Sequence, residues 1–188
     1  MLVSDENDGF NFEQASSLLK SMIPPGIRVQ EIQRGQLDSE EARVRLIEAI
    51  ASGQKLVNYA GHGSVNQWRG GLLDSEDARA LANSDRLPVF IMMTCLNGYF
   101  LEAGGVSLSE ALITAGRGGA VAVWASTGLT LPQDQALMNQ ALYGAIFNRN
   151  VLKRATLGET TRRAKLAVSD VDVRRTWVLL GDPTMRLK

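Results

Sequence analysis

The chain contains a single cysteine, Cys95, and a single histidine, His62, and each follows an apolar stretch typical of a buried β-strand. Residues 89–93 are all apolar and end just before Cys95, and residues 55–60 precede His62 in a similar way. A thiol attacks a carbonyl carbon only as its thiolate, and the ordinary thiol pKa of about 8.5 leaves it mostly protonated at neutral pH. Because a neighbouring imidazole can accept that proton, the two residue types predict covalent acyl transfer.

A crossover connection between the two apolar stretches would bring these residues together. The segment between His62 and Cys95 is long enough for a loop, a helix and a return strand. These are the parts of a βαβ unit, in which the two strands are parallel. Parallel strands end at the same edge of a sheet, and ligands bind beyond that edge in folds of this kind. We therefore expect His62 and Cys95 to meet there, with the backbone N–H groups of Gly63 and Cys95 as donors to a developing oxyanion.

More ordinary roles for the same two residues stay open at this point. A lone cysteine after a buried strand is often an inert core residue, and a lone histidine in a glycine-rich loop is often structural. One cysteine and one histidine are too few ligands for a tetrahedral zinc site. The sequence has no Gly-x-Ser-x-Gly motif, so a serine hydrolase of the nucleophile-elbow type is not indicated.

Strand and helix patterns alternate along the chain, which predicts an α/β fold with a mostly parallel sheet sandwiched by helices. The expected strands cover residues 1–4, 27–32, 55–60, 89–93, 120–125 and 176–180. The expected helices cover residues 12–23, 39–52, 75–83, 107–115, 132–148 and 156–168.

The composition argues against several functional classes. Lysine plus arginine and aspartate plus glutamate both number 20, so no basic excess indicates a nucleic-acid partner. No apolar run approaches the ~18 residues of a membrane span, and residues 1–5 do not resemble a signal peptide. The 188 residues, of which 45% are hydrophobic, are expected to form one domain, residues 1–188.

Several blocks of sequence, in order along the chain, resemble the gingipain family of bacterial cysteine peptidases. They are residues 58–64 (Asn-Tyr-Ala-Gly-His-Gly-Ser), 94–100 (Thr-Cys-Leu-Asn-Gly-Tyr-Phe), 107–111, 116–122 and 179–184. The resemblance implies a caspase-like fold and hydrolysis of peptide bonds by a Cys–His dyad through a thioester acyl-enzyme. It also implies an extracellular or cell-envelope location, a protein or peptide substrate, and other domains of a larger parent protein as partners.

Carried over residue by residue, the resemblance makes Cys95 the nucleophile and His62 the catalytic histidine, with Gly63 and Cys95 supplying the oxyanion hole. Family members can orient the histidine with an acidic residue at the end of the first strand. Asp5 is the candidate here and Asp8 the second, with a surface-loop role as the alternative for both. No cofactor is expected to be required. Some members bind calcium, and the acidic segment 5–8 could hold a cation, although it matches no defined calcium loop.

The resemblance also predicts that residues 124–132 line the pocket for the substrate residue before the scissile bond. Arginine-cleaving members have a tryptophan after the corresponding strand end, whereas residues 128–131 contain two leucines that predict an apolar rim. No acidic residue can be assigned to the pocket floor, so specificity for basic residues is not carried over. Trp68 could pack beneath the His62 segment or contact substrate. The candidate pocket residues are Trp124, Ala125, Ser126, Thr127, Leu129 and Leu131.

Two other functions stay open beside the peptidase. The same dyad could transfer the acyl group to an amine other than water, which is transpeptidation, the sortase-like processing of secreted proteins. The chain could instead be a catalytically silent caspase-like module that binds partners. The presence of both His62 and Cys95 favours an enzyme.

Overall fold

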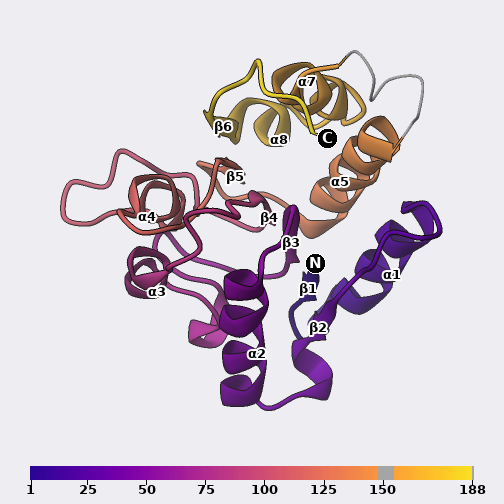
Figure 1. The fold of residues 1–188 in the computed structure, drawn as a ribbon. Helices are drawn as coiled ribbons and strands as arrows, with labels where there is room; N and C mark the ends of the chain where they lie inside the picture. Colours follow the sequence, from indigo (N-terminus) through magenta and orange to yellow (C-terminus); the bar gives the residue numbers. More distant parts are fainter. Residues whose placement is uncertain (148–154, 188) are drawn as a thin grey trace.

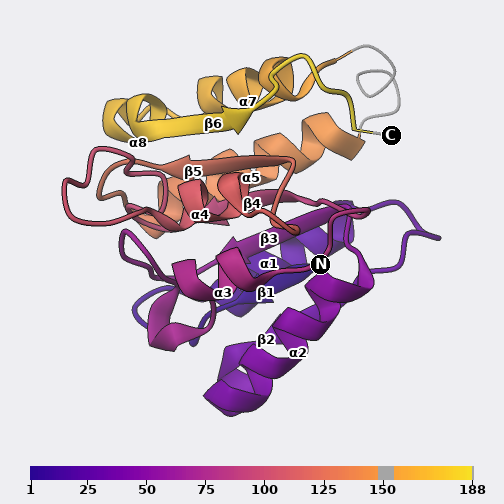
Figure 2. The same ribbon diagram turned by 60° about the vertical axis from the view of Figure 1, so that its left-hand side comes forward.

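A six-stranded sheet forms the centre of the computed structural model, which describes residues 1–147 and 155–187 (Figure 1). The strand order is β2-β1-β3-β4-β5-β6; the first five strands are parallel, and β6 pairs with β5 in the antiparallel direction. β2 and β6 lie at the two edges of the sheet (Figure 2). The predicted α/β fold with a mostly parallel sheet is therefore confirmed. The strands are β1 (Leu2–Ser4), β2 (Glu31–Gln33), β3 (Leu56–Ala60), β4 (Val89–Met93), β5 (Ala122–Ser126) and β6 (Trp177–Gly181).

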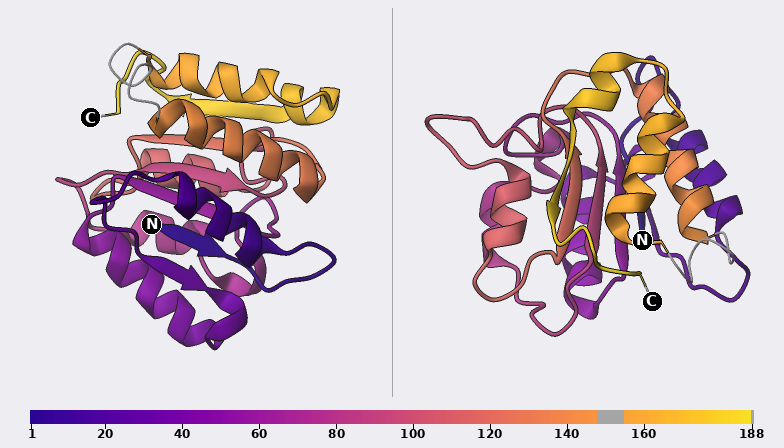
Figure 3. Two further views of the ribbon diagram at one scale, coloured as in Figure 1. Left: turned by 90° about the vertical axis from the view of Figure 1, so that its right-hand side faces the viewer. Right: turned by 90° about the horizontal axis from the view of Figure 1, so that it is seen from above.

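Helices cover both faces of the sheet (Figure 3). One face carries α2 (Ser39–Ser52), α3 (Ser75–Ala80) and α4 (Leu108–Thr114). The opposite face carries α1 (Phe12–Met22), α5 (Pro132–Phe147) and α7 (Leu157–Leu166), and the short α8 (Val171–Thr176) leads into β6. Because both faces are covered, the central strands are apolar at nearly every position.

Alternating side chains of each strand enter two separate cores. In β4, Phe90 and Met92 pack under α2, α3 and α4, whereas Ile91 and Met93 pack under α1, α5 and α7. The one polar residue in the middle of β3, Asn58, is fully buried and exchanges two hydrogen bonds with Asn139 of α5, at 3.0 and 3.1 Å. This pair gives each buried amide one donor and one acceptor partner and ties α5 to the middle of β3.

Local sequence determines where most helices begin. The Asp38 carboxylate accepts a hydrogen bond from the Glu41 N–H at the start of α2, and Ser107 with Glu110 forms a complete capping box at the start of α4. These caps agree with the helix starts predicted from the sequence.

The secondary structure differs from the prediction at several points, one of which is that the helix expected over residues 75–83 ends at Ala80. The strand expected over residues 27–32 is present only as β2, because Ile27 is exposed after a Pro-Pro-Gly turn and β1 offers just three residues for pairing. The helix α8 was not predicted; it is six residues long and begins where Asp170 accepts a hydrogen bond from the Val173 N–H. The helix expected to reach residue 148 is seen to Phe147, and its last expected residue lies outside the described residues.

Candidate functional site

The ends of β3 and β4 bring the two candidate residues to the same edge of the sheet. The strands are in register, with Ala60 opposite Met93, and the Gly61 N–H continues the pairing to the Met93 carbonyl at 3.2 Å. His62 and Cys95 are each the second residue beyond these paired ends. We call residues 61–71 the His62 loop and residues 94–105 the Cys95 loop.

A buried carboxylate at the end of β1 holds the His62 loop. Asp5 is fully buried; one of its oxygens accepts hydrogen bonds from the Glu6 N–H at 2.9 Å and the Arg34 guanidinium at 2.8 Å. The other oxygen accepts the backbone N–H of His62 at 3.1 Å, and Arg69 lies 3.9 Å away. A charged acceptor with this many donors is well compensated in spite of its burial.

The aromatic residues Tyr59 and Trp68 pack beneath the same loop. Their rings are stacked with centroids 4.1 Å apart, and the Tyr59 hydroxyl donates to the His62 carbonyl at 2.8 Å. Burial, with the negative charge of Asp5 nearby, raises the pKa of Tyr59 well above its usual value, so it stays a neutral donor. Trp68 is fully buried, which favours the packing role over contact with a substrate.

The imidazole of His62 is 44% exposed and faces two side chains from the segment after β1. The Phe12 ring meets it edge to face at a centroid distance of 5.3 Å, and the Asp8 carboxylate lies 3.9 Å from Nε2. Asp8 also pairs with Arg69 at 2.7 Å. Asp5 was the first candidate for orienting the imidazole, but its oxygens contact the backbone of His62, and Asp8 is the carboxylate that the ring faces.

Cys95 is half-buried at the start of the Cys95 loop. Its Sγ lies 3.5 Å from both the N–H and the carbonyl oxygen of Thr130. The loop turns sharply at Leu96, whose φ of 60° is in the left-handed region that non-glycine residues seldom occupy. Such a turn directly after a strand presents the preceding side chain at the edge of the sheet, as a nucleophile requires.

The two loops are linked beside the predicted oxyanion hole. Asn97 is fully buried and donates hydrogen bonds from its side chain to the carbonyls of Ser64 and Gln67. Gly63 approaches so closely that a Cβ there would lie 2.6 Å from Thr94 Oγ1. Within residues 1–147 and 155–187, no hydrogen bond is found from the backbone N–H of Gly63 or of Cys95. Both N–H groups thus have no acceptor among the described residues.

The predicted substrate-pocket residues fall into two groups. Trp124 and Ala125 are fully buried in the two cores, which corrects the prediction that their side chains line a pocket: both faces of β5 are covered by helices. Ser126 is also buried, and its hydroxyl bonds to Gly128 and Thr176; the Thr127 hydroxyl bonds to the Thr176 carbonyl. Leu129 and Leu131 are 75% and 64% exposed, as an apolar rim requires.

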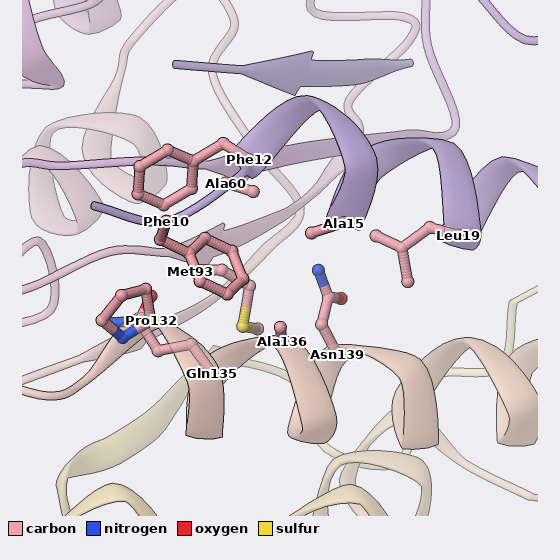
Figure 4. A pocket seen from close by; sticks show the side chains of 10 residues that line it. All are labelled: Phe10, Phe12, Ala15, Leu19, Ala60, Met93, Pro132, Gln135, Ala136 and Asn139. Atoms are coloured by element: carbon pink, nitrogen blue, oxygen red, sulfur yellow. The ribbon is translucent and has the colours of Figure 1, made fainter. Parts of the chain in front are cut away.

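An apolar hollow lies between α1 and α5, above the ends of β3 and β4 (Figure 4). Two aromatic residues that the sequence analysis did not single out, Phe10 and Phe12, form its wall on the α1 side. They follow the acidic segment after β1, and no motif in the sequence marks them. The lining residues are Phe10, Phe12, Ala15, Leu19, Ala60, Met93, Pro132, Gln135, Ala136 and Asn139.

Acidic residues near the site are engaged by arginines. Asp5 pairs with Arg34, and Asp8 pairs with Arg69. In the described part of the chain, no group of three or more His, Cys, Asp or Glu side chains is arranged to hold a metal ion. Nor does any described helix combine the length and the apolar character that crossing a bilayer requires.

Comparisons with known proteins agree with the fold and the sequence blocks. The family model described as Peptidase family C25 matches residues 1–188. Gingipain R2 and gingipain R1 of Porphyromonas gingivalis are each 31% identical over 157 residues, which cover 76% of this chain but 21% and 15% of the relatives. The chain thus spans about a fifth or less of the length of these curated relatives.

Solved structures extend the likeness to the whole chain. The crystal structure of the Arg-specific cysteine proteinase gingipain R superimposes with a TM-score of 0.85 at 22% identity, covering 100% of this chain and 47% of that one. The complex of Porphyromonas gingivalis RgpB pro- and mature domains gives a TM-score of 0.83 at 22% identity, covering 100% and 48%. The predicted caspase-like fold of the gingipains is therefore confirmed.

Proposed function

The chain belongs to peptidase family C25, the family of the gingipains, and we propose that it is a cysteine endopeptidase in which Cys95 is the nucleophile and His62 the general acid and base. The observation that carries the proposal is the register of β3 and β4, which puts both residues at the second position beyond paired strand ends. The free N–H groups of Gly63 and Cys95 beside them support an oxyanion hole at the same edge.

In the acylation step, the Cys95 thiolate attacks the carbonyl carbon of the scissile peptide bond. The carbonyl oxygen becomes an oxyanion and accepts hydrogen bonds from the Gly63 and Cys95 N–H groups. His62 takes the thiol proton and donates a proton to the leaving amine as the C–N bond breaks, which leaves a thioester on Cys95. The Asp8 carboxylate, 3.9 Å from Nε2, would stabilise the imidazolium that forms between these transfers.

In the deacylation step, water attacks the thioester carbonyl and His62 accepts a proton from it. The C–S bond breaks, the thiol is restored, and the carboxylic acid product leaves. Asp5 takes no proton in this scheme, since its oxygens accept hydrogen bonds from the loop and from Arg34. It acts as a positioning residue that fixes the backbone from which the imidazole extends.

Partners and location belong to the same proposal. The substrate is a protein or peptide, other domains of a parent protein pack against this one, and the protein works outside the cell or in the cell envelope. Support for the domain partners comes from the relatives, which are several times longer than this chain, and from the solved complex of pro- and mature domains. No cofactor is required in the proposed chemistry.

Two substitutions test the proposal, with cleavage of denatured casein as the readout. Cys95→Ala is expected to lower turnover at least ~10³-fold and His62→Ala roughly 10²- to 10⁴-fold, because each removes a group that acts in the transition state. Both variants should unfold in urea at nearly the same midpoint as the wild-type protein, because neither change should disturb the fold. A Cys95→Ala variant that retains the wild-type rate would exclude the proposed nucleophile.

A second readout separates the peptidase from its two alternatives. Alkylation of Cys95 by iodoacetamide, followed by intact mass across pH, should be fast at neutral pH in the wild type and slower in His62→Ala. An added amine that appears in the products of peptide cleavage would indicate transpeptidation instead of hydrolysis. Slow alkylation that is unchanged by His62→Ala would favour the silent binding module.

A further inference from the structure

We propose that the hollow between α1 and α5 binds the side chain of the substrate residue that precedes the scissile bond, and that this residue is apolar. The inference rests on the proposed function and adds the class of substrate to it. The hollow is formed by α1, α5 and the ends of β3 and β4 (Figure 4).

The hollow lies between the two candidate catalytic residues. On one side, its lining residue Phe12 meets the His62 ring edge to face. On the other side, its lining residue Gln135 donates to the Thr130 carbonyl at 3.2 Å, and the same carbonyl lies 3.5 Å from Cys95 Sγ. Each residue of the proposed dyad is therefore linked to this one hollow: His62 through Phe12, and Cys95 through Thr130 and Gln135.

The distance of each substrate residue from the attacked carbonyl carbon determines which side chain can enter the hollow. The carbonyl carbon that bonds to Sγ is attached directly to the Cα of the residue before the scissile bond, and the next Cα along the chain is about 3.8 Å further away. The floor of the hollow is formed by Ala60 and Met93, the last residues of β3 and β4 before the two loops. The side chain closest to the attacked carbon is thus the one placed to enter.

The chemistry of the lining excludes a charged occupant. None of the described residues that line the hollow is charged. The two polar ones already use amide groups inside the protein: the Gln135 NH₂ donates to Thr130, and Asn139 exchanges hydrogen bonds with Asn58. A guanidinium, ammonium or carboxylate that entered would lose its water without gaining a partner, which is strongly unfavourable.

The size of the hollow points to a small or medium apolar side chain. It spans about 300 Å³ with the open solvent at its mouth included, while the enclosed part has room for about one water molecule. Phe10, which is half-buried and packs edge to face on Phe12 at 5.1 Å, must turn aside to admit more. The exposed Leu131, directly before Pro132 of the lining, continues the apolar surface outward.

An apolar residue before the scissile bond would distinguish this chain from gingipain R, which has the same fold. The crystal structure of gingipain R is described as that of an Arg-specific proteinase, and an arginine side chain in a buried pocket needs a carboxylate partner. The hollow of the present chain offers none. The family fold is thus retained while the class of residue before the scissile bond changes.

The test uses peptidyl acyloxymethyl ketones that differ only in the residue next to the reactive ketone: valine, leucine, arginine or glutamate. The Cys95 sulfur displaces the carboxylate leaving group and forms a thioether, which intact mass detects without any need for turnover. We expect the valine and leucine probes to label Cys95 at least about tenfold faster than the arginine and glutamate probes. Equal rates, or faster labelling by arginine, would overturn the inference.

A carboxylate introduced into the lining should shift the labelling preference from apolar probes toward the arginine probe. Ala15→Asp on α1, or Ala136→Asp on α5 if the first variant does not fold, places a carboxylate in the hollow. Either should raise labelling by the arginine probe relative to valine by about tenfold or more. Ser17→Asp is the matched control, because Ser17 is on the exposed face of α1 and should leave the ratio unchanged. A shift of the same size in Ser17→Asp would contradict the assignment.

The outcomes distinguish this inference from the function on which it rests. Casein cut in a His62-dependent way, with no enrichment of apolar residues before the cut, would overturn the inference and leave the peptidase intact. Apolar enrichment only after the cut would also overturn it, because the hollow would then bind the leaving side. If no peptidyl probe labels Cys95 although iodoacetamide does, the hollow takes no substrate side chain, and the casein assay judges the peptidase separately.

Discussion

The His62 loop and the Cys95 loop start from neighbouring strands in register, yet different kinds of contact hold them. The His62 loop rests on buried charge: Asp5, fully enclosed, binds its backbone and is neutralised by Arg34. The Cys95 loop is held by neutral contacts, among them backbone hydrogen bonds from Leu96 to Gly128, just after β5, at 3.3 Å and from Gly98 to Ser126, the last residue of β5, at 2.8 Å. Beyond Tyr99 its residues 100–105 are exposed.

In the proposed mechanism, the difference follows from what each residue must do. A nucleophile one turn beyond a strand is already positioned by the strand, and short neutral contacts are sufficient. An imidazole that transfers protons, at the same distance from its strand, must in addition keep the direction of its ring, so its loop needs a rigid support. A buried acceptor that is matched to several donors gives such support, because any displacement leaves a charge without partners.

The first prediction tests this contrast between the loops: Asp5→Asn is expected to cause the largest loss of stability. Every recorded contact of the Asp5 oxygens is with a donor, so an amide in either orientation turns its NH₂ group toward another N–H. The change also leaves the buried Arg34 with only the more exposed Glu6 carboxylate, 3.7 Å away, as a counter-ion. We expect a loss of about 3 kcal/mol or more in the free energy of unfolding, measured by urea denaturation with fluorescence of the buried tryptophans.

The matched control for this change is Glu31→Gln, which alters the more exposed ion pair with Lys20 in the same chemical way. Its effect should stay below about 1 kcal/mol, since exposed pairs contribute little. The double variant Asp5→Asn with Arg34→Met should lose less stability than the sum of the two single variants. Additive losses would mean that the pair does not act as a unit, and the contrast between the two loops would disappear.

The family resemblance named Asp5 near His62, but its pairing with Arg34 could not be predicted from the sequence, whereas the ends of the strands could. Cys95 and His62 each follow a run that is apolar because both faces of the sheet are covered, and this local signal is strong. The partnership of Asp5 with Arg34 joins residues 29 positions apart and depends on the register of the two short strands β1 and β2. Nothing in either local sequence specifies that pairing.

The residues that line the hollow could not be predicted from the sequence either. Trp124 and Ala125 were expected to line a pocket, but adjacent residues of a strand point to opposite faces, and helices cover both faces here. Phe10 and Phe12 line the hollow because α1 packs across the sheet against α5. That packing is a tertiary contact between segments far apart in sequence, so no local pattern could assign these two residues to the site.

The second prediction compares one glycine from each loop. A Cβ at Gly61 would collide with the Asp5 Cβ and the Tyr59 hydroxyl, whereas a Cβ at Gly104 would meet nothing within 4 Å. We expect Gly61→Ala to lower the free energy of unfolding by roughly 1–3 kcal/mol and Gly104→Ala to change it by less than about 0.5 kcal/mol. Urea denaturation of both variants measures the difference. Similar losses at the two positions would show that the Cys95 loop is as tightly supported as the His62 loop.

The third prediction concerns Asn97, a side chain that joins the two loops, and it sharpens the comparison most. Asn97→Ala removes two hydrogen bonds to the Ser64 and Gln67 carbonyls and should lower the free energy of unfolding by about 1–2 kcal/mol. Asn83→Ala is its control: Asn83 is equally an amide that ties two segments, bonding the N–H and the carbonyl of Gly119. If the link between the loops sets the position of His62 relative to Cys95, alkylation of Cys95 should lose its dependence on His62 in Asn97→Ala and keep it in Asn83→Ala. Equal behaviour of the two variants would mean that the link through Asn97 does not align the pair, and that the strands and the Asp5 contacts are sufficient for it.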